Sequence, residues 1–366
     1  MSHRKPDILL LSAYRSDSHA AWVTWLVDHL EANWRVLELP GRYFRWRIRG
    51  NPLSWLDALP ELLQGRQPDR ILATSMVDIC TLRGLHPALA NVPVSLYFHE
   101  NQFAYPIGDG QHSSVDPLMV QLYGALAADE LLFNSDYNQC TFLEGVDALM
   151  DRMPDARPER LSTRLAPRCH WLPVPVEAVK PESGMARDSD ERTPLILWNH
   201  RWEYDKCPEA LLTLVDELDQ RHVSYELALL GAGAKRRHHV REQLQQRLGK
   251  RVVASGFLPR DEYLGWLSKA DIVFSAAQHE FQGLAMLEAV SAGAFPVVPN
   301  ALCYEEQYPE ECRYPAGDIR AAVDRVEQYL MQPNGRDVAV SIDRWLAPAT
   351  ASRWQSWLAS ITAGET

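Results

Sequence analysis

The stretch that decides the fold is 271–288, with the sequence DIVFSAAQHEFQGLAMLE. It begins with an apolar run typical of a buried strand, passes through a loop ending in Gly283, and continues as an amphipathic helix. A helix that starts after a strand and a glycine presents free N–H groups and the positive end of its dipole to an anion. We therefore expect Glu280 at the mouth of an anion site and Glu288, eight residues on, about two helical turns away.

The same alternation of apolar runs and amphipathic stretches continues along the whole chain. The expected strands are residues 8–12, 35–39, 70–74, 94–98 and 130–134, and then 195–198, 226–230, 252–255, 272–275 and 295–298. Strands that alternate with helices predict parallel sheets covered by helices. We expect an α/β fold with two doubly wound, Rossmann-like domains facing a cleft, and ligands at the carboxyl ends of the strands.

A chain of 366 residues is long enough for about two domains. Residues 177–193 are polar and contain Pro, Ser and Gly, which is typical of a linker. We therefore expect an N-terminal domain over 1–176 and a C-terminal domain over 194–344. The last segment, 345–366, is expected to end in an amphipathic helix that contains Trp354 and Trp357.

The composition is that of a soluble globular enzyme, with 46% hydrophobic and 23% charged residues. A net charge of −11 argues against binding nucleic acid over the whole surface. The six cysteines are scattered, without a Cys-x-x-Cys pair, and neither they nor the histidines predict a metal site. No signal-peptide pattern and no apolar stretch of about 20 residues is present, so we expect a cytoplasmic protein without a membrane span.

Two further stretches follow strands of the second half. The run WNHRWEYDK, 198–206, places Arg201 and Lys206 after a strand, where two cations suit a diphosphate leaving group. The alternative for this run is a charged surface loop. Gly231, in the run LLGAGAK, allows a ligand close to the backbone, although a tight turn explains it nearly as well.

In the first half, the run YFHENQ, 97–102, ends a strand with polar side chains. Such side chains face the ligand edge of a parallel sheet. His99 and Glu100 are therefore candidates for acid–base chemistry or for binding sugar hydroxyls. The alternative for His99 is a buried histidine with only a structural role.

The Glu280 and Glu288 pair, with Arg201 and Lys206 upstream, resembles the retaining glycosyltransferases of family 4 (GT4), which have the GT-B fold. The resemblance implies that Arg201 and Lys206 hold a donor diphosphate, that Glu280 contacts the donor sugar, and that His99 lies near the transferred sugar. It implies no required metal, and a C-terminal helix that crosses back onto the first domain. The residues implied to complete the nucleotide-sugar site are Asn199, Gly231, Phe257, Phe281, Gln282, Gly283, Leu284 and Glu288.

A closer resemblance within that family spans both halves of the chain. The strings YFHENQ at 97–102, YP at 105–106, WNHRWEYDK at 198–206 and HEFQGLAMLE at 279–288 look like those of the tRNA-queuosine α-mannosyltransferase group. So does the segment 134–143. This resemblance implies GDP-mannose as the donor and queuosine in the tRNA anticodon loop as the acceptor, bound on the side of the first domain.

Acceptor and RNA recognition are expected from the first half. The family's first loop carries Gly-Gly before Ser-His, whereas this chain keeps Ser18 and His19 without a glycine. The segment 42–49 contains four arginines and three aromatic residues, which suit phosphates and splayed bases of an RNA loop. The alternative for it is an edge strand or loop with solvated charges. The expected acceptor and RNA contacts are Ser18, His19, Arg42, Arg45, Trp46, Arg47, Arg49, Glu100, Asn101 and Gln102.

Other functions remain open from the sequence alone. One is a GT4 enzyme that acts on an envelope lipid, a polysaccharide or a small-molecule acceptor. Another is a catalytically silent RNA-binding or scaffold protein, which would have no need for Arg201, Lys206, Glu280 and Glu288 together. A third is a nucleotide-sugar epimerase, which would need a water and a base in place of an acceptor.

Overall fold

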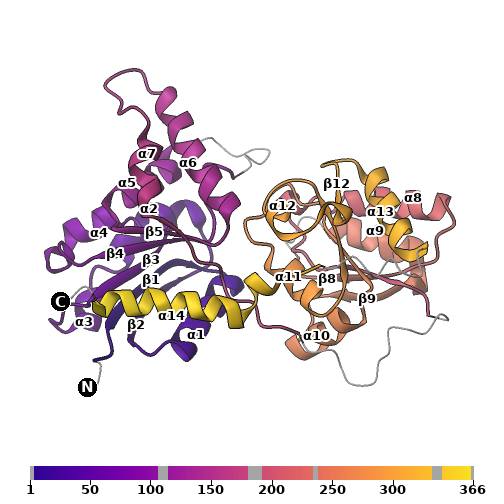
Figure 1. Cartoon of the computed structure of the whole chain (residues 1–366), viewed down its shortest axis with the longest axis horizontal. Coiled ribbons are helices and arrows are strands. Elements are labelled where there is room, and N and C mark those ends of the chain that lie inside the picture. Colours follow the sequence, from indigo (N-terminus) through magenta and orange to yellow (C-terminus); the bar gives the residue numbers. More distant parts are fainter. Residues whose placement is uncertain (1–3, 106–113, 180–191, 234–237, 332–339, 364–366) are drawn as a thin grey trace. The chain divides into compact units, whose positions relative to one another are not determined.

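The chain forms two compact units, each built on a six-stranded parallel sheet (Figure 1). The computed structural model describes residues 4–105, 114–179, 192–233, 238–331 and 340–363. One unit is Met1–Pro175 with Pro348–Thr366, and the other is Val176–Ala347. The predicted class, two α/β domains with parallel sheets, is confirmed. Residues 180–191 of the predicted linker, Pro106 and the basic residues 235–237 lie outside the described residues.

The sheet of the first unit has the strand order β2-β1-β3-β4-β5-β6, and all its pairs are parallel. Its strands are β1 (Asp7–Arg15), β2 (Asn33–Pro40), β3 (Arg70–Thr74), β4 (Val94–Phe98), β5 (Glu130–Phe133) and β6 (Cys169–Trp171). In this doubly wound order the direction of winding reverses between β1 and β3.

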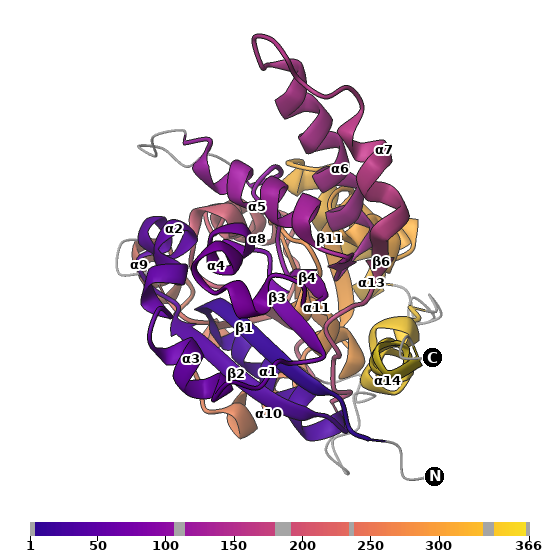
Figure 2. The same cartoon turned by 90° about the vertical axis from the view of Figure 1, so that its left-hand side faces the viewer.

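Helices cover both faces of the first sheet, and α1 and α14 lie on the side opposite α4, α5 and α6 (Figures 1 and 2). The helices are α1 (Asp17–His29), α2 (Phe44–Ser54), α3 (Ala58–Leu63), α4 (Ile79–Leu85), α5 (Asp116–Ala127), α6 (Asp136–Asp151), α7 (Leu161–Leu165) and α14 (Ala347–Ala363). Strands covered on both faces need apolar side chains throughout, which explains why Ile8, Leu9, Leu10 and Leu11 are all fully buried.

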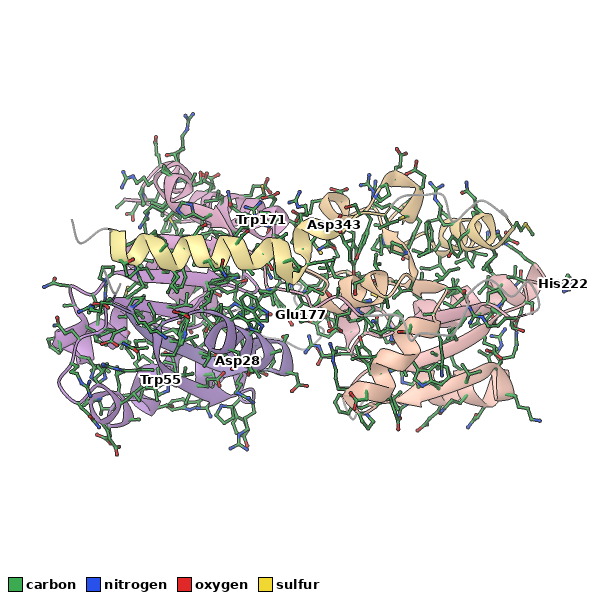
Figure 3. The ribbon with its side chains drawn as sticks, turned by 60° about the horizontal axis from the view of Figure 1, so that its bottom comes forward. Asp28, Trp55, Trp171, Glu177, His222 and Asp343 are labelled. Carbon is green, nitrogen blue, oxygen red and sulfur yellow. The ribbon has the colours of Figure 1, made fainter. Side chains whose placement is uncertain are left out.

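The C-terminal helix α14 packs on the first unit through its tryptophans. The indole N–H of Trp354 donates to the carbonyl of Pro173 at 3.0 Å, and that of Trp357 donates to the Glu130 carboxylate at 3.1 Å. Trp171, at the end of β6, lies beside α14 (Figure 3). A buried indole satisfies its N–H while it contributes a large apolar area, so these side chains attach the last helix to this sheet.

The sheet of the second unit has the strand order β12-β11-β10-β7-β8-β9. Its strands are β7 (Leu195–Trp198), β8 (Glu226–Leu230), β9 (Val252–Gly256), β10 (Ile272–Phe274), β11 (Phe295–Pro299) and β12 (Arg313–Tyr314). Counted from β7, this is the dinucleotide-binding order 3-2-1-4-5-6, in which the winding reverses between the first and fourth strands. That point lies here between β7 and β10.

Among the described residues, the helices that accompany the second sheet are α8 (Ala210–Gln220), α9 (His238–Leu248), α10 (Arg260–Lys269), α11 (Leu284–Ser291), α12 (Tyr304–Gln307) and α13 (Ile319–Met331). A single-turn 3-10 helix, Tyr204–Lys206, follows the loop after β7. In the part of the chain that the structure describes, none of the helices is long and apolar enough to cross a bilayer.

Candidate functional site

The second unit brings its two predicted motifs together at the point where the winding reverses. β7 and β10 are paired neighbours in the sheet, so the loops that follow them begin side by side. The first loop leads to Lys206 and the second to Glu280, 74 residues later in the chain. Ligands of doubly wound sheets bind at this position, outside the carboxyl ends of the strands.

Lys206 and Glu280 form a buried ion pair. The Nζ of Lys206 lies 3.0 Å from Oε2 of Glu280 and donates to the carbonyl of His279 at 2.5 Å. The carboxylate of Asp205 lies 3.2 Å from the same Nζ. Two of the three N–H groups of the ammonium therefore donate to His279 and Glu280, and Asp205 adds a second negative charge. A charge buried this deeply is tolerated because it is paired with opposite charges.

The electrostatics of this cluster keep its members ionised. Burial by itself would raise the pKa of Glu280, but its neighbours, with Lys206 foremost, together outweigh burial and lower that pKa to about 2. Burial would lower the pKa of Lys206, whereas Glu280 and Asp205 together raise it. The Asp205 pKa is lowered in spite of burial, through His279 and Lys206. A fixed positive charge therefore lies beside two carboxylates at neutral pH.

His200 is a member of this cluster that sequence reasoning missed. It is buried, and burial followed by the charge of Lys206 lowers its pKa to about 4, so the imidazole is neutral at pH 7. Its Nε2 has no hydrogen-bond partner among the described residues. The only available signal was its place in the run 198–206, between two residues that were predicted.

Gly231 holds the loop after β7 against the end of β8. Its φ is +110°, and a Cβ at this position would lie 2.2 Å from the carbonyl oxygen of His200. Beside it, Trp202 donates its backbone N–H to the carbonyl of Ala232 at 3.0 Å. The close approach that was predicted for Gly231 is therefore made by the protein's own backbone, which positions the loop containing Lys206.

The loop after β10 turns into α11 at Gly283, which has a φ of +63°. α11 begins at Leu284, so the N–H groups of its first turn have no partners inside the helix. Phe281 and Gln282 are buried beneath the turn, and the carbonyl of Gln282 accepts from the Gln307 side chain at 2.6 Å. The predicted anion-binding geometry of a strand, a glycine and a helix start is present.

Glu288 lies in the second turn of α11, where Arg260 and Tyr263 of α10 donate to it at 2.6 and 3.2 Å. Asn199 contacts both helices, because its side-chain amide donates to the Tyr263 hydroxyl and to the carbonyl of Ala285. Neither Arg260 nor Tyr263 was predicted. Their spacing on α10 had no recognisable pattern, and only the fold brings that helix to α11.

The remaining predicted donor residues are accessible. Arg201 is exposed and forms an ion pair with Glu203 at 3.2 Å. Phe257 follows Gly256, whose φ is +113°, and is 73% exposed. Within the described ranges, no three His, Cys, Asp or Glu side chains come together as metal ligands would.

In the first unit, His99 lies directly after β4 and packs against His19 of α1, with the two rings tilted by 45°. The two rings are 4.0 Å apart between centroids, and Nδ1 of His19 lies 2.6 Å from the hydroxyl of Ser16. Burial, and then the neighbouring His19, lower the pKa of His99 well below its usual value. His99 is therefore neutral at pH 7. Ser18 is exposed, with its hydroxyl 3.1 Å from that of Ser16.

Two buried side-chain amides, those of Asn101 and Gln121, hold the loop after β4 in place. Asn101 is fully buried, and its side chain binds Asn138 and the backbone N–H of Ala104. Gln121 accepts from the backbone N–H of Gln102 at 2.8 Å and donates to the carbonyl of Glu100 at 3.4 Å. The observed contacts of Asn101 shape the loop, while Glu100 and Gln102 remain partly accessible.

Residues 44–49 form the start of α2, and Arg42 and Tyr43 lie just before it, so an edge strand is wrong for this segment, whereas its solvated charges remain an alternative. Three of its predicted RNA-contacting side chains, Arg42, Arg45 and Trp46, are exposed, and Trp46 is 50% accessible. Arg49 is exposed as well but forms an ion pair with Asp78 at 2.8 Å, and the half-buried Arg47 donates to the Ser54 hydroxyl at 3.4 Å. The helix therefore presents arginines and an aromatic ring together.

Comparison with solved structures defines the class of the fold. Sucrose-phosphate synthase from Thermosynechococcus elongatus is 16% identical, with a TM-score of 0.67 over 99% of this chain and 97% of that one. The trehalose-6-phosphate phosphatase N-terminal domain from Candida albicans is 12% identical, with a TM-score of 0.70 over 99% and 98%. With its two parallel-sheet units, the chain has the GT-B fold.

Sequence comparison defines the family. The family model described as "tRNA-queuosine alpha-mannosyltransferase N-terminal" matches residues 7–176, and the model "Glycosyl transferases group 1" matches residues 180–340. A tRNA-queuosine alpha-mannosyltransferase from Drosophila melanogaster is 34% identical over 324 residues, 86% of this chain and 85% of the relative. The chain belongs to the tRNA-queuosine alpha-mannosyltransferase family, so the resemblance seen in its motifs is confirmed.

The contact at Gly231 predicts a stability difference between two glycine variants. Gly231→Ala places a Cβ 2.2 Å from the His200 carbonyl at a φ of +110°. Gly249→Ala also has a positive φ, +55°, but its Cβ meets nothing within 4 Å. Chemical denaturation should show that Gly231→Ala costs about 2 kcal/mol more than Gly249→Ala. Equal losses would mean that the contact with His200 does not restrict this position.

The lowered pKa of His200 predicts an acid-dependent stability. The pKa of His200 is 6.5 in the unfolded chain and about 4 in the folded one. Between these values the unfolded chain binds a proton that the folded chain does not, so the free energy of unfolding is highest above pH 6.5 and falls progressively down to pH 4. Across that window wild type should lose roughly 3 kcal/mol more than His200→Gln in denaturant titrations. The exposed His222 (Figure 3) provides the control, because His222→Gln should retain the wild-type slope. Parallel curves for wild type and His200→Gln would contradict the prediction.

Proposed function

We propose that this enzyme is a retaining glycosyltransferase that transfers mannose from GDP-mannose to queuosine in the anticodon loop of tRNA. The observation that carries the proposal is the buried Lys206–Glu280 pair beside the start of α11, in a chain 34% identical to a tRNA-queuosine alpha-mannosyltransferase. The buried cation of the pair suits an anionic leaving group. The similarity to the relative supports mannose as the transferred sugar and queuosine as its acceptor.

The second unit binds the donor in this proposal. Arg201, Lys206 and the N-terminus of α11 stabilise the diphosphate as negative charge grows on it. Glu280 contacts the donor sugar, Glu288 binds the ribose hydroxyls, and Phe257 lies by the base. Because the two cations and the helix supply the positive charge, we propose that the reaction requires no metal ion.

The first unit binds the acceptor. A hydroxyl of the queuosine cyclopentenediol attacks the anomeric carbon on the face that the nucleotide leaves. The bond from that carbon to the β-phosphate oxygen breaks, and the departing phosphate takes the hydroxyl proton. We assign the neutral His99 as a hydrogen-bonding group for the transferred sugar, and Ser18, His19, Glu100 and Gln102 as groups for the acceptor. A tRNA acceptor also fits a cytoplasmic location.

Product analysis tests the proposal directly. The protein is incubated with queuosine-containing tRNA and either GDP-mannose or UDP-sugars, and the digested nucleosides are analysed by mass. A hexose on queuosine from GDP-mannose is expected, unchanged by EDTA and lost in Lys206→Ala, which removes the buried cation. No hexose with any donor would overturn the tRNA acceptor. A hexose on a lipid or small molecule alone would point to another acceptor for the same donor site.

The exposed start of α2 predicts a defect in tRNA recognition. Stacking of a base on an aromatic side chain contributes about 1–3 kcal/mol, so Trp46→Ala should raise the KM for tRNA by about tenfold with little change in the KM for the donor. Arg45→Ala should reduce the slope of log K for tRNA binding against log salt concentration by about one, the value for the loss of one phosphate contact.

Tyr123 provides a matched control for Trp46. It is an aromatic residue of α5 that is 52% exposed, close to the 50% of Trp46. Tyr123→Ala should leave the KM for tRNA near the wild-type value. If both aromatic variants weaken tRNA binding equally, or if neither does, α2 is not the RNA-binding surface.

A further inference from the structure

The carboxylate of Glu288 is held by two donors from one face of α10. Nη2 of Arg260 donates to its Oε1 at 2.6 Å, and the hydroxyl of Tyr263 donates to its Oε2 at 3.2 Å. Arg260 and Tyr263 are three residues apart on the helix, so they lie on the same face. The guanidinium of Arg260 also lies over the Tyr263 ring, 5.4 Å from its centroid. The two donors therefore support each other as well as Glu288.

Asn199 connects this arrangement to the rest of the site. Its Nδ2 donates to the Tyr263 hydroxyl at 3.2 Å and to the carbonyl of Ala285, in the first turn of α11, at 2.7 Å. Tyr263 thus receives one hydrogen bond and donates another. The loop after β7, α10 and α11 are joined in a single chain of hydrogen bonds that ends on Glu288.

The protonation state of Tyr263 is consistent with its donating a hydrogen bond to Glu288. Burial raises the pKa of the Tyr263 phenol far above its usual value, and the charge of Glu288 raises it further, so the phenol keeps its proton. An ionised carboxylate offers about two acceptor positions on each oxygen. The protein occupies one position on each oxygen of Glu288, and the remaining position on each suits two neighbouring hydroxyl groups.

We propose that Tyr263 and Arg260 are positioning residues, which orient the Glu288 carboxylate so that both of its oxygens accept hydrogen bonds from the ribose hydroxyls of the donor nucleotide. The inference rests on the proposed function, because it assumes that a nucleotide sugar occupies this site. Neither residue needs to touch the nucleotide. Their effect on it passes through Glu288.

The experiment compares two nucleotides that differ only at the ribose. GDP and 2′-deoxy-GDP are titrated calorimetrically into the full-length wild type, Tyr263→Phe and Arg260→Gln. Hydrogen bonds to a charged group are strong, so each variant should bind GDP about tenfold more weakly, with a much smaller change for 2′-deoxy-GDP. Glu288→Gln should remove the preference for GDP, and adding Tyr263→Phe to it should cause no further loss.

A second trio of the same chemistry provides the matched control. Arg251 and Tyr225 both bind the carboxylate of Asp219, at 2.7 and 3.0 Å, and the Arg251 guanidinium lies 5.0 Å from the Tyr225 ring centroid. Tyr225 directly precedes β8 and so lies at the amino ends of the strands, whereas the site lies at their carboxyl ends. Tyr225→Phe and Arg251→Gln therefore report what such bonds contribute to folding alone, and both should keep the wild-type preference for GDP.

Steady-state kinetics with GDP-mannose separates positioning from a general defect. Tyr263→Phe should raise the KM for the donor about tenfold and leave kcat near wild type, because the bonds to ribose are the same in the ground and transition states. A loss confined to kcat would overturn the inference. Arg260→Gln keeps the test decisive if Tyr263→Phe does not fold, since the Arg260 side chain is 56% exposed.

Two outcomes separate this inference from the proposed function. If wild type binds GDP and Tyr263→Phe retains the full preference over 2′-deoxy-GDP, the positioning role is wrong and the proposed function stands. If wild type binds neither GDP nor UDP, the proposed donor fails and the inference fails with it.

Discussion

The second unit depends on the buried pairing of Lys206 with Glu280. Neither side chain could remain charged in this buried site alone, because the desolvation of an isolated buried ion costs several kcal/mol. The pair connects the loop after β7 to the loop after β10, the His279 carbonyl accepts a second hydrogen bond from the ammonium, and Asp205 forms a further ion pair with it. Burial, and then the same positive charge, lower the pKa of His200, so the ion pair also contributes to the neutral state of the neighbouring imidazole.

Both carboxylates of α11 and its preceding loop are anchored before any ligand arrives. Glu280 is held by Lys206, and Glu288 by Arg260 and Tyr263. Groups that are already ordered lose little conformational freedom on binding, so more of the contact energy appears as affinity. The turn at Gly283 is what places the two glutamates on either side of the helix start.

In the proposed function, the first unit recognises RNA although the protein is acidic as a whole. Net charge acts over long distances, but phosphate contacts are local and screened within about 10 Å at ordinary ionic strength. The exposed arginines and Trp46 at the start of α2 can therefore act in spite of a total charge of −11. His99 lies directly after a strand and beside His19 of α1, and burial keeps its own imidazole neutral.

The sequence by itself determined the alternation of strands and helices, the turn at Gly283 and the identity of Glu280 and Lys206, because these follow from local periodicity and from motifs within one run of residues. Only the tertiary structure decided that β7 lies beside β10, that a helix begins at Phe44, and that Tyr263 supports Glu288. Strand order and contacts between distant helices depend on packing across the whole unit. The neutral state of His200 likewise depends on burial and neighbouring charge, which no single stretch of sequence contains.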